Sequence, residues 1–406
     1  MLPKLVNHSD DLRRLVSEGY HIEVKGDHLL MHNVPYVNSA KQVCQGTLVV
    51  GLYCVNGATT TPGNHVAWFI GEHPCNADGT PQSGLVGNPH AAQLTPTLAV
   101  NCMFSSKPTH GRGYRDHHEQ LTTYANMLWH PAVVIDPACK PCTFPRYTDT
   151  TDGATTQSPF LFTDTATLRA GLGAIAPKLA QQNVAIIGLG GTGSYVLDLI
   201  AKTPIVHIHL YDGDGLVQHN AFRAPGAVSV AVLDEKITKV EHYKRIYSQM
   251  RSGIVANACC VTEENVAALA QMDFVFVCID RGDAKPAIFK ALIAANVPFI
   301  DVGMGVELTS AGLTALIRTT YCTATAHQHA TEGGRVSFAQ PPLNAEYQRN
   351  IQLADLNMLN AALAVIRWKK HCGFYQNFGS EHHSSYSLAT NHLLNEEIDG
   401  APTNQD

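Results

Sequence analysis

The clearest structural pattern in this chain lies between Asn183 and Arg223, where the sequence reads NVAIIGLGGTGSYVLDLIAKTPIVHIHLYDGDGLVQHNAFR. This order predicts a strand, a glycine turn, a helix, a second strand and an acidic loop. Residues 184–187 form a short apolar run that is typical of a buried parallel strand. Residues 206–211 form a second run, which ends at Asp212. The pattern predicts an α/β unit with a mostly parallel sheet.

The predicted turn between the first strand and the helix has glycine at most of its positions. Glycine permits a tight turn and lets a phosphate approach the backbone, while free amides and the helix dipole favour an anion there. Asp212 stands about where a ribose-binding carboxylate belongs in such a unit. The stretch therefore predicts a nucleotide site, whose turn residues are Gly188, Gly190, Gly191, Thr192 and Gly193.

Length and composition limit the classes of protein that fit. The 406 residues are enough for two to three domains, and 45% hydrophobic with 15% charged residues is ordinary for a globular protein. A net charge of −6 argues against a nucleic-acid coat or a binder of anionic membranes. The chain shows no cationic and apolar leader and no apolar run near ~18 residues, so we expect a cytoplasmic protein without membrane partners.

The composition changes along the chain and suggests four segments. Residues 1–147 contain short alternating runs between Gly, Pro and Asn, which predict a smaller β-rich α+β domain of unknown role. Residues 148–164 are polar and read as a linker. Residues 165–378 are α/β in pattern, and the polar residues 379–406 are expected to be a flexible tail.

The eleven cysteines are scattered and odd in number, so reduced thiols are expected rather than a disulfide framework. Cys139 and Cys142 form a Cys-x-x-Cys pair that lacks a second such pair, and whether they bind metal stays open.

Polar residues beyond the glycine turn carry a resemblance to a known family. The motifs are Gly-x-Gly-Gly-x-Gly-Ser, Asp212-x-Asp214, Asn220-x-x-Arg223, Lys239-Val240-Glu241 and Cys278-x-Asp280. Through them, about half of the chain, from Arg169 to Tyr375, resembles the ThiF/MoeB/HesA superfamily. This superfamily supplies the adenylating core of enzymes that activate ubiquitin, ubiquitin-like and sulfur-carrier proteins. The resemblance implies a Rossmann-like adenylation core that uses ATP and Mg²⁺.

The chemistry of adenylation explains why such residues are needed. A carboxylate that attacks the α-phosphate of ATP meets repulsion between anions, so positive groups and magnesium must neutralise the phosphates and hold the carboxylate in line. In the family pattern Asp212 binds the ribose, Asn220, Arg223 and Lys239 face the phosphates, and Asp280 supports magnesium and the leaving pyrophosphate. Asp214 either shapes the loop or touches the ligand.

Two further positions follow from the resemblance. Lys236 keeps the usual distance from Arg223, but Lys239 keeps the Lys-Val-Glu context and is preferred. Arg169 precedes the glycine turn where many relatives have an arginine that reaches the ATP of the partner subunit. This position implies a homodimer with shared active sites.

The chain also departs from the family pattern. The two zinc-binding Cys-x-x-Cys pairs that many relatives carry in the C-terminal half are absent, because only Cys322 and Cys372 follow Cys278. Cys322 is the only candidate by position for a thioester-forming nucleophile, and it could equally be an inert thiol at a strand end. Bacterial chains that fuse an uncharacterised β-rich domain to a ThiF core have the same organisation as this one.

The sequence therefore predicts ATP-dependent adenylation of the C-terminal carboxylate of a ubiquitin-like or sulfur-carrier protein, with release of pyrophosphate. Whether thioester transfer follows, with a conjugating enzyme as a further partner, stays open. Residues 1–147, fused to the activating core, are well placed to capture the protein substrate. The alternatives are activation of a small-molecule or tRNA-base carboxylate, an NAD-dependent oxidoreductase, and a nucleotide-binding scaffold without catalysis. Asn220, Arg223 and Asp280 argue against the oxidoreductase, since hydride transfer does not require them.

Overall fold

The computed structural model describes residues 2–108, 111–147, 158–280, 282–332, 334–338, 351–379 and 381–397. The chain divides into two compact units. The N-terminal unit comprises Met1–Thr156 with Phe162–Ala174, and the C-terminal unit comprises Gln157–Leu161 with Ile175–Asp406. Within the described part of the chain, no helix has the length and apolar character needed to cross a membrane.

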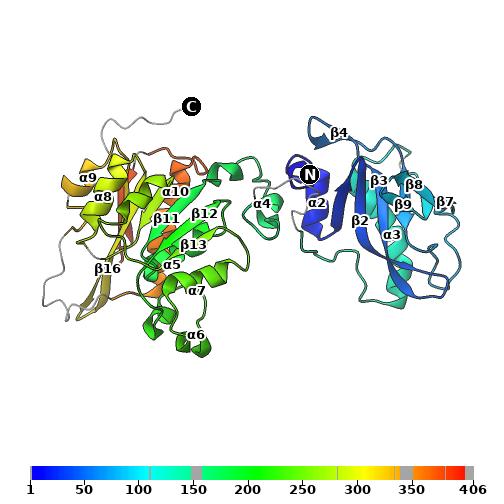
Figure 1. The fold of residues 1–406 in the computed structure, drawn as a ribbon. Helices are drawn as coiled ribbons and strands as arrows, with labels where there is room; N and C mark the ends of the chain where they lie inside the picture. Colours follow the sequence, from blue (N-terminus) through cyan, green and yellow to red (C-terminus); the bar gives the residue numbers. More distant parts are fainter. Residues whose placement is uncertain are drawn as a thin grey trace. The chain divides into compact units, whose positions relative to one another are not determined.

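The N-terminal unit is built on a six-stranded antiparallel sheet with the order β1-β2-β3-β6-β10-β7 (Figure 1). Helix α3 (His117–Ile135) packs on β2 and β3 and buries Leu121, Tyr124 and Leu128 in the main core of this unit. The predicted β-rich N-terminal region is confirmed. Its other elements are α1 (Leu2–Asn7), α2 (Asp10–Glu18), β1 (His21–Lys25), β2 (His28–Val37), β3 (Val43–Gly51), β4 (Cys54–Val55), β5 (Ala58–Thr59), β6 (Val66–Ile70), β7 (Val86–Asn88), β8 (Ala92–Thr95), β9 (Leu98–Val100), β10 (Cys102–Ser105) and α4 (Thr165–Arg169).

The C-terminal unit contains an eight-stranded sheet with the order β13-β12-β11-β14-β15-β16-β17-β18. The first five strands in this order are parallel, and β16, β17 and β18 then follow, each antiparallel to the strand before it in the order. The predicted Rossmann-like core with a mostly parallel sheet is confirmed. The strands are β11 (Asn183–Ile187), β12 (His207–Tyr211), β13 (Ile254–Asn257), β14 (Phe274–Val277), β15 (Phe299–Thr309), β16 (Gly312–Cys322), β17 (Glu381–Ser387) and β18 (His392–Glu397).

Helices cover both faces of this sheet because the central strands are apolar on both sides. One face buries alternate strand residues such as Ile186 and Phe276 against α5, α7 and α10, while the other face buries Val275 and Val277 against α8. The helical segments of the unit are η1 (Ala176–Leu179), α5 (Gly191–Ile200), η2 (Gln218–Phe222), α6 (Val230–Asp234), α7 (Lys239–Tyr247), η3 (Val266–Gln271), α8 (Lys285–Ala294), α9 (Gln328–Glu332) and α10 (Ala354–His371).

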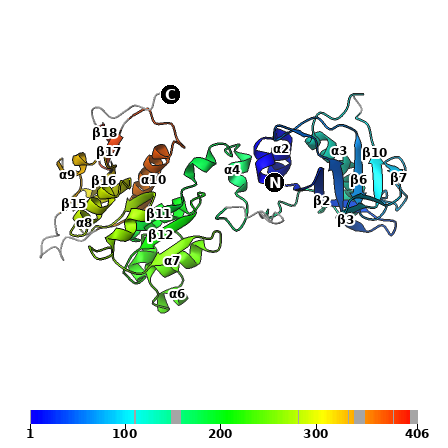
Figure 2. The same cartoon turned by 45° about the horizontal axis from the view of Figure 1, so that its top comes forward.

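The structure corrects the expectation of a flexible tail over residues 379–406. Residues 381–387 and 392–397 form the β17–β18 hairpin, which extends the sheet beyond β16 (Figure 2). His382 and His383 are buried there, at 8% and 5% exposed. Their polar sequence hid a strand because its backbone pairs with β16, which is distant in sequence. Residue 380 and residues 398–406 of the expected tail lie outside the described part.

The expected boundary near residue 165 also differs from the division observed. Helix α4 packs against α1 and α2 and buries Leu168 in the N-terminal core, so residues 162–174 belong to the first unit. Most of the predicted linker, residues 148–157, lies outside the described residues.

Candidate functional site

The glycine turn joins β11 to α5 at the carboxyl end of the parallel strands. Gly188 has a φ of 90°, and a Cβ atom there would lie 2.7 Å from the carbonyl oxygen of Cys278. A Cβ atom on Gly193 would lie 1.8 Å from the carbonyl oxygen of Gly188. These two glycines are required by the fold itself. A Cβ atom on Gly190 would meet no atom of the described chain within 4 Å, so this glycine leaves open space in front of the amino terminus of α5.

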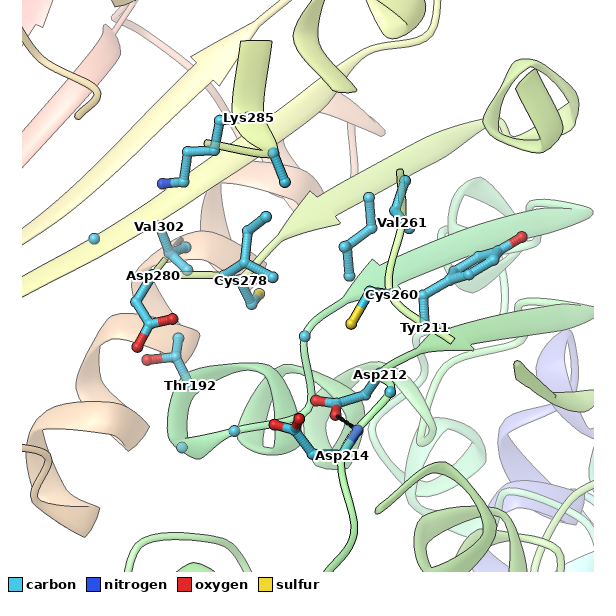
Figure 3. A pocket seen from close by; sticks show the side chains of 18 of the residues that line it. Thr192, Tyr211, Asp212, Asp214, Cys260, Val261, Cys278, Asp280, Lys285 and Val302 are labelled. Atoms are coloured by element: carbon cyan, nitrogen blue, oxygen red, sulfur yellow. Dashed lines mark hydrogen bonds between the residues drawn. The ribbon is translucent and has the colours of Figure 1, made fainter. Parts of the chain in front are cut away.

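A cavity of about 620 Å³ lies over this turn and the ends of the neighbouring strands (Figure 3). Ligand sites in open α/β sheets occur at this edge, outside the carboxyl ends of the strands. Most of the residues singled out from the sequence line the cavity: Gly188, Gly190, Gly191, Thr192, Asp212, Asp214, Arg223, Lys239 and Asp280.

Asp212 ties the acidic loop to the glycine turn. It follows β12, is 8% exposed, and its Oδ2 accepts a hydrogen bond of 2.7 Å from the backbone N–H of Leu189. Its Oδ1 accepts one of 2.9 Å from the backbone N–H of Asp214. The carboxylate therefore holds two loops of the cavity in place. Its predicted contact with a ribose stays a prediction.

Lys239 is buried at the start of α7 and pairs with both carboxylates of the acidic loop. Its Nζ lies 2.6 Å from Oδ2 of Asp214 and 3.4 Å from Oδ1 of Asp212. Lys239 lines the cavity, whereas Lys236 is not part of the lining and has a φ of 52° in the preceding turn. The geometry favours Lys239 over Lys236 as the cation at this site.

Arg223 brings a positive charge to the cavity. It follows η2, and its Nε is buried without a hydrogen-bond partner in the described structure. Its backbone is fixed by Asn357 of α10, whose Nδ2 donates to the Arg223 carbonyl at 3.3 Å. The Oδ1 of the same amide accepts a 3.0 Å hydrogen bond from the Thr192 hydroxyl. Asn357 therefore links the glycine turn to Arg223. The sequence motifs did not indicate it as a site residue.

Asn220 does not line the cavity as the structure describes it. Its side chain is 4% exposed, and its Oδ1 accepts a 2.9 Å hydrogen bond from the backbone N–H of Val217. Asn220 therefore shapes the turn that presents Arg223. A direct contact with phosphates stays a prediction.

Asp280 follows β14 and lies on the cavity wall opposite the amino terminus of α5. In Figure 3 its carboxylate points toward Thr192. Asp283 also lines the cavity, from the loop before α8. Two carboxylates, those of Asp280 and Asp283, therefore line the same cavity as Gly190.

Two predicted catalytic residues lie elsewhere. Arg169 is exposed on α4 in the N-terminal unit, so its predicted contact with a partner's ATP is not addressed. Cys322 is fully buried at the end of β16, outside the described cavity lining, with its Sγ 4.0 Å from Nε2 of His329. Burial raises the pKa of this thiol, and the pKa of Cys278 rises for the same reason. A protonated and inaccessible thiol argues against Cys322 as a nucleophile in this conformation.

Charged residues that the sequence motifs did not indicate lie at the other wall of the cavity. Nζ of Lys285, the first residue of α8, lies 2.6 Å from Oδ1 of Asp301 on β15, and the two side chains are 4% and 2% exposed. Burial raises the pKa of Asp301, while the nearby cations Lys285 and Arg318 act in the opposite direction. Asp301 follows an apolar run in the same way as Asp212 and Asp280. This shared position was the sequence feature that could have indicated Asp301 as a residue near the site.

We call this wall the strand side of the cavity; it is lined by Lys285, Gly303, Arg318 and Asn360, and the buried Asp301 supports it through Lys285. We call the other wall the glycine side, comprising Gly188, Gly190, Gly191, Asp212, Asp214 and Lys239. In Figure 3, Lys285 and Val302 lie on one side of the cavity and Asp212 and Asp214 on the other. A ligand in this cavity can therefore contact two walls of different chemistry, the glycine side and the strand side.

Comparison with known proteins agrees with this architecture. Residues 170–343 match the model of the ThiF family, and residues 10–165 match a domain of unknown function, DUF6791. No curated protein matches the chain.

Solved structures similar to this chain include MccB from E. coli with MccA-N7isoASN, at 17% identity over 59% of this chain and 70% of that one, with a TM-score of 0.45. MccB from E. coli with ATP is 18% identical over 59% of this chain and 70% of its own, with a TM-score of 0.43. PaaA is 16% identical over 68% of this chain and 82% of its own, with a TM-score of 0.44. The match of residues 170–343 to the ThiF family model agrees with the strand order and the glycine turn of the Rossmann-like core.

Proposed function

We propose that this protein uses ATP to adenylate the C-terminal carboxylate of a ubiquitin-like or sulfur-carrier protein. The carboxylate oxygen attacks the α-phosphorus, the bond from that phosphorus to the bridging oxygen of the β-phosphate breaks, and pyrophosphate leaves with the electron pair. The observation that carries the proposal is Arg223, whose Nε is buried without a hydrogen-bond partner in the described structure and which lines the same cavity as the glycine turn and Asp280. Phosphoryl groups need such a cation, whereas hydride transfer does not.

The glycine side supplies the phosphate contacts in this proposal. Open space at Gly190 lets a phosphate reach the free amides at the start of α5, where the helix dipole favours an anion. Arg223 faces the same space from η2. Lys239 is held by Asp214, whose side chain is 72% exposed and can move aside when a phosphate competes for the ammonium group. Preorganised cations of this kind stabilise the charge that develops as pyrophosphate leaves.

The residues present also fit magnesium. No group of three His, Cys, Asp or Glu side chains that could hold a metal occurs among the described residues, but magnesium is commonly bound by one or two carboxylates together with substrate phosphates. Asp280 and Asp283 line the cavity and supply such oxygen ligands. When bound, the metal would neutralise charge on the β- and γ-phosphates.

The carrier and the assembly belong to the same proposal. In this proposal the N-terminal unit captures the protein substrate. Two copies of the chain form a homodimer, in which Arg169 of one copy reaches the ATP bound by the other. The fused domain organisation and the exposure of Arg169 are compatible with these roles. Transfer of the acyl group to a cysteine, with a conjugating enzyme as the next partner, is a further step that the burial of Cys322 does not support in this conformation.

Magnesium-dependent ATP–pyrophosphate exchange with candidate carriers tests the proposal. We expect Arg223→Ala and Asp280→Ala each to reduce exchange by about 100-fold or more, the size seen when one transition-state donor is removed. Arg245→Ala is the matched control, because Arg245 pairs with Glu235 on the surface and does not line the described cavity. Exchange should require a free carrier C-terminus. Tight NAD binding without any exchange would instead favour an oxidoreductase, and exchange supported by a small carboxylate alone would favour small-molecule activation.

A further inference from the structure

The strand side of the cavity has polar groups that the proposed ATP contacts do not use. They gather around Gly303 of β15, which pairs with Arg318 of β16 in the antiparallel register. A Cβ atom on Gly303 would lie 2.4 Å from Nη2 of Arg318, so the guanidinium rests directly on this glycine. From α10, Nδ2 of Asn360 donates to the carbonyl oxygen of Gly303 at 3.2 Å. Arg318 and Asn360 therefore meet at one residue, and both line the cavity.

Asn360 presents a buried acceptor that has no donor. The residue is 1% exposed, and its Oδ1 has no hydrogen-bond partner within the described structure. The orientation of the amide is set by the chemistry of its neighbour, because the Gly303 carbonyl can only accept and so must face the NH₂ group. A buried oxygen without a donor is costly, so Oδ1 of Asn360 is an acceptor for a donor that the described protein does not itself supply.

Arg318 is the positive charge that remains available on this side. Lys285 lines the cavity, but its ammonium group pairs with Asp301 at 2.6 Å, and the buried Asp301 is not part of the lining. Nη1 of Arg318 donates to the carbonyl oxygen of Arg335, and no hydrogen bond of Nη2 is found in the described part of the chain. The guanidinium is thus anchored at one nitrogen and can offer the other to an anionic oxygen.

We propose that Arg318 and Asn360 form the acyl subsite of this cavity. Arg318 binds an oxygen of the carboxylate that attacks ATP, and Oδ1 of Asn360 accepts the backbone N–H of the same terminal residue. The inference rests on the proposed adenylation and narrows its substrate to a polypeptide C-terminus whose last residue has a backbone N–H. A carboxylate without a neighbouring N–H donor, or a chain that ends in proline, leaves Asn360 unsatisfied.

Three non-reactive adenosine ligands test the subsite without knowledge of the carrier. Sulfamoyladenosine lacks an acyl group, N-acetylglycyl-sulfamoyladenosine adds an acyl oxygen and an amide N–H, and N-acetylsarcosyl-sulfamoyladenosine replaces that N–H with N–CH₃. Their affinities are measured by calorimetry on the full chain. We expect the wild type to bind the glycyl ligand at least about tenfold more tightly than both other ligands.

The variants assign this preference to the two residues. Arg318→Leu should lose the advantage of the glycyl ligand over sulfamoyladenosine, and Asn360→Ala should lose the discrimination between the glycyl and sarcosyl ligands. Lys290→Ala, on the exposed face of α8, is the control and should retain both preferences. Unchanged binding of sulfamoyladenosine shows that each variant is folded.

The possible failures are distinct. Equal binding of all three ligands by the wild type, or full preference in Arg318→Leu and Asn360→Ala, would overturn the acyl subsite and leave adenylation standing. A wild type that binds neither sulfamoyladenosine nor ATP would remove the proposed function and the subsite together.

Discussion

The glycine side and the strand side of the cavity reach similar electrostatic arrangements by different routes. On the glycine side Lys239 pairs with Asp212 and Asp214, and Asp214 is largely exposed. On the strand side Lys285 pairs with Asp301, and both side chains are almost fully buried. The first pair can open to admit a ligand, whereas the second is part of the core. A charged residue in a cavity lining can therefore either contact a ligand or stabilise the fold. The exposure of its ion-pair partner distinguishes the two roles, because an exposed partner can move away and a buried one cannot.

Lys285→Met is expected to have the largest effect on stability. Removal of one partner from a buried ion pair leaves the other charge uncompensated and costs about 3 to 5 kcal/mol of unfolding free energy. Burial raises the pKa of Asp301 and Lys285 opposes this rise, so Lys285→Met should raise the pKa further. A carboxyl with a raised folded-state pKa lowers the stability of the protein as the pH rises through that pKa, and the variant should lose more stability than the wild type. The loss should therefore be larger at about pH 8 than at about pH 5.

Hydrogen exchange of β15 and α8 in increasing urea measures this loss within the C-terminal unit. The double variant Lys285→Met with Asp301→Leu should regain most of the stability, because no unpaired charge remains. Lys290→Met on the same helix is the control. If Lys285→Met lowered the free energy of unfolding by less than about 1 kcal/mol, the pair would behave like a solvent-exposed ion pair, as expected for Lys239 and Asp214, and the contrast would fail.

Gly193→Ala and Gly190→Ala sharpen the comparison within the glycine side. The new methyl group at Gly193 would meet the Gly188 carbonyl, so we expect a loss of about 3 kcal/mol, at the upper end for overpacking. At Gly190 the methyl group enters open space, so unfolding should change by less than about 1 kcal/mol. Binding of ATP to Gly190→Ala, measured by calorimetry, should weaken by about tenfold, since the methyl group occupies the phosphate path. Normal ATP affinity in Gly190→Ala would show that phosphates do not approach this turn.

Asp214→Asn is expected to have the smallest effect on stability. Its ion pair with Lys239 is open to solvent, and such pairs contribute about 1 kcal/mol or less. Asp212→Asn should cost more, because the buried Asp212 carboxylate also accepts hydrogen bonds from Leu189 and Asp214. Thermal unfolding of the two variants makes the comparison directly. Equal losses would contradict the assignment of Asp214 as the partner that moves aside.

Prediction from sequence succeeded where the signal is local. The glycine turn, the apolar strands and the polar motifs lie close together along the chain, and they were enough to predict the parallel core and most of the glycine side. Prediction was wrong for the tail, since β17 has a polar sequence and becomes a strand by pairing with β16. The roles of Arg169 and Asn220 stay predictions, because neither side chain lines the cavity described here.

The sequence by itself determined the strand–turn–helix unit, because backbone sterics at Gly188 and apolar strand patterning act over a few residues. Through the resemblance to the ThiF/MoeB/HesA superfamily, it also indicated Arg223, Lys239 and Asp280, which line the cavity. Only the tertiary structure decided that Arg318 and Asn360 meet at Gly303, and that Lys285 finds Asp301. These contacts join α8, β15, β16 and α10, and they form only when packing of the sheet and its covering helices brings distant residues together.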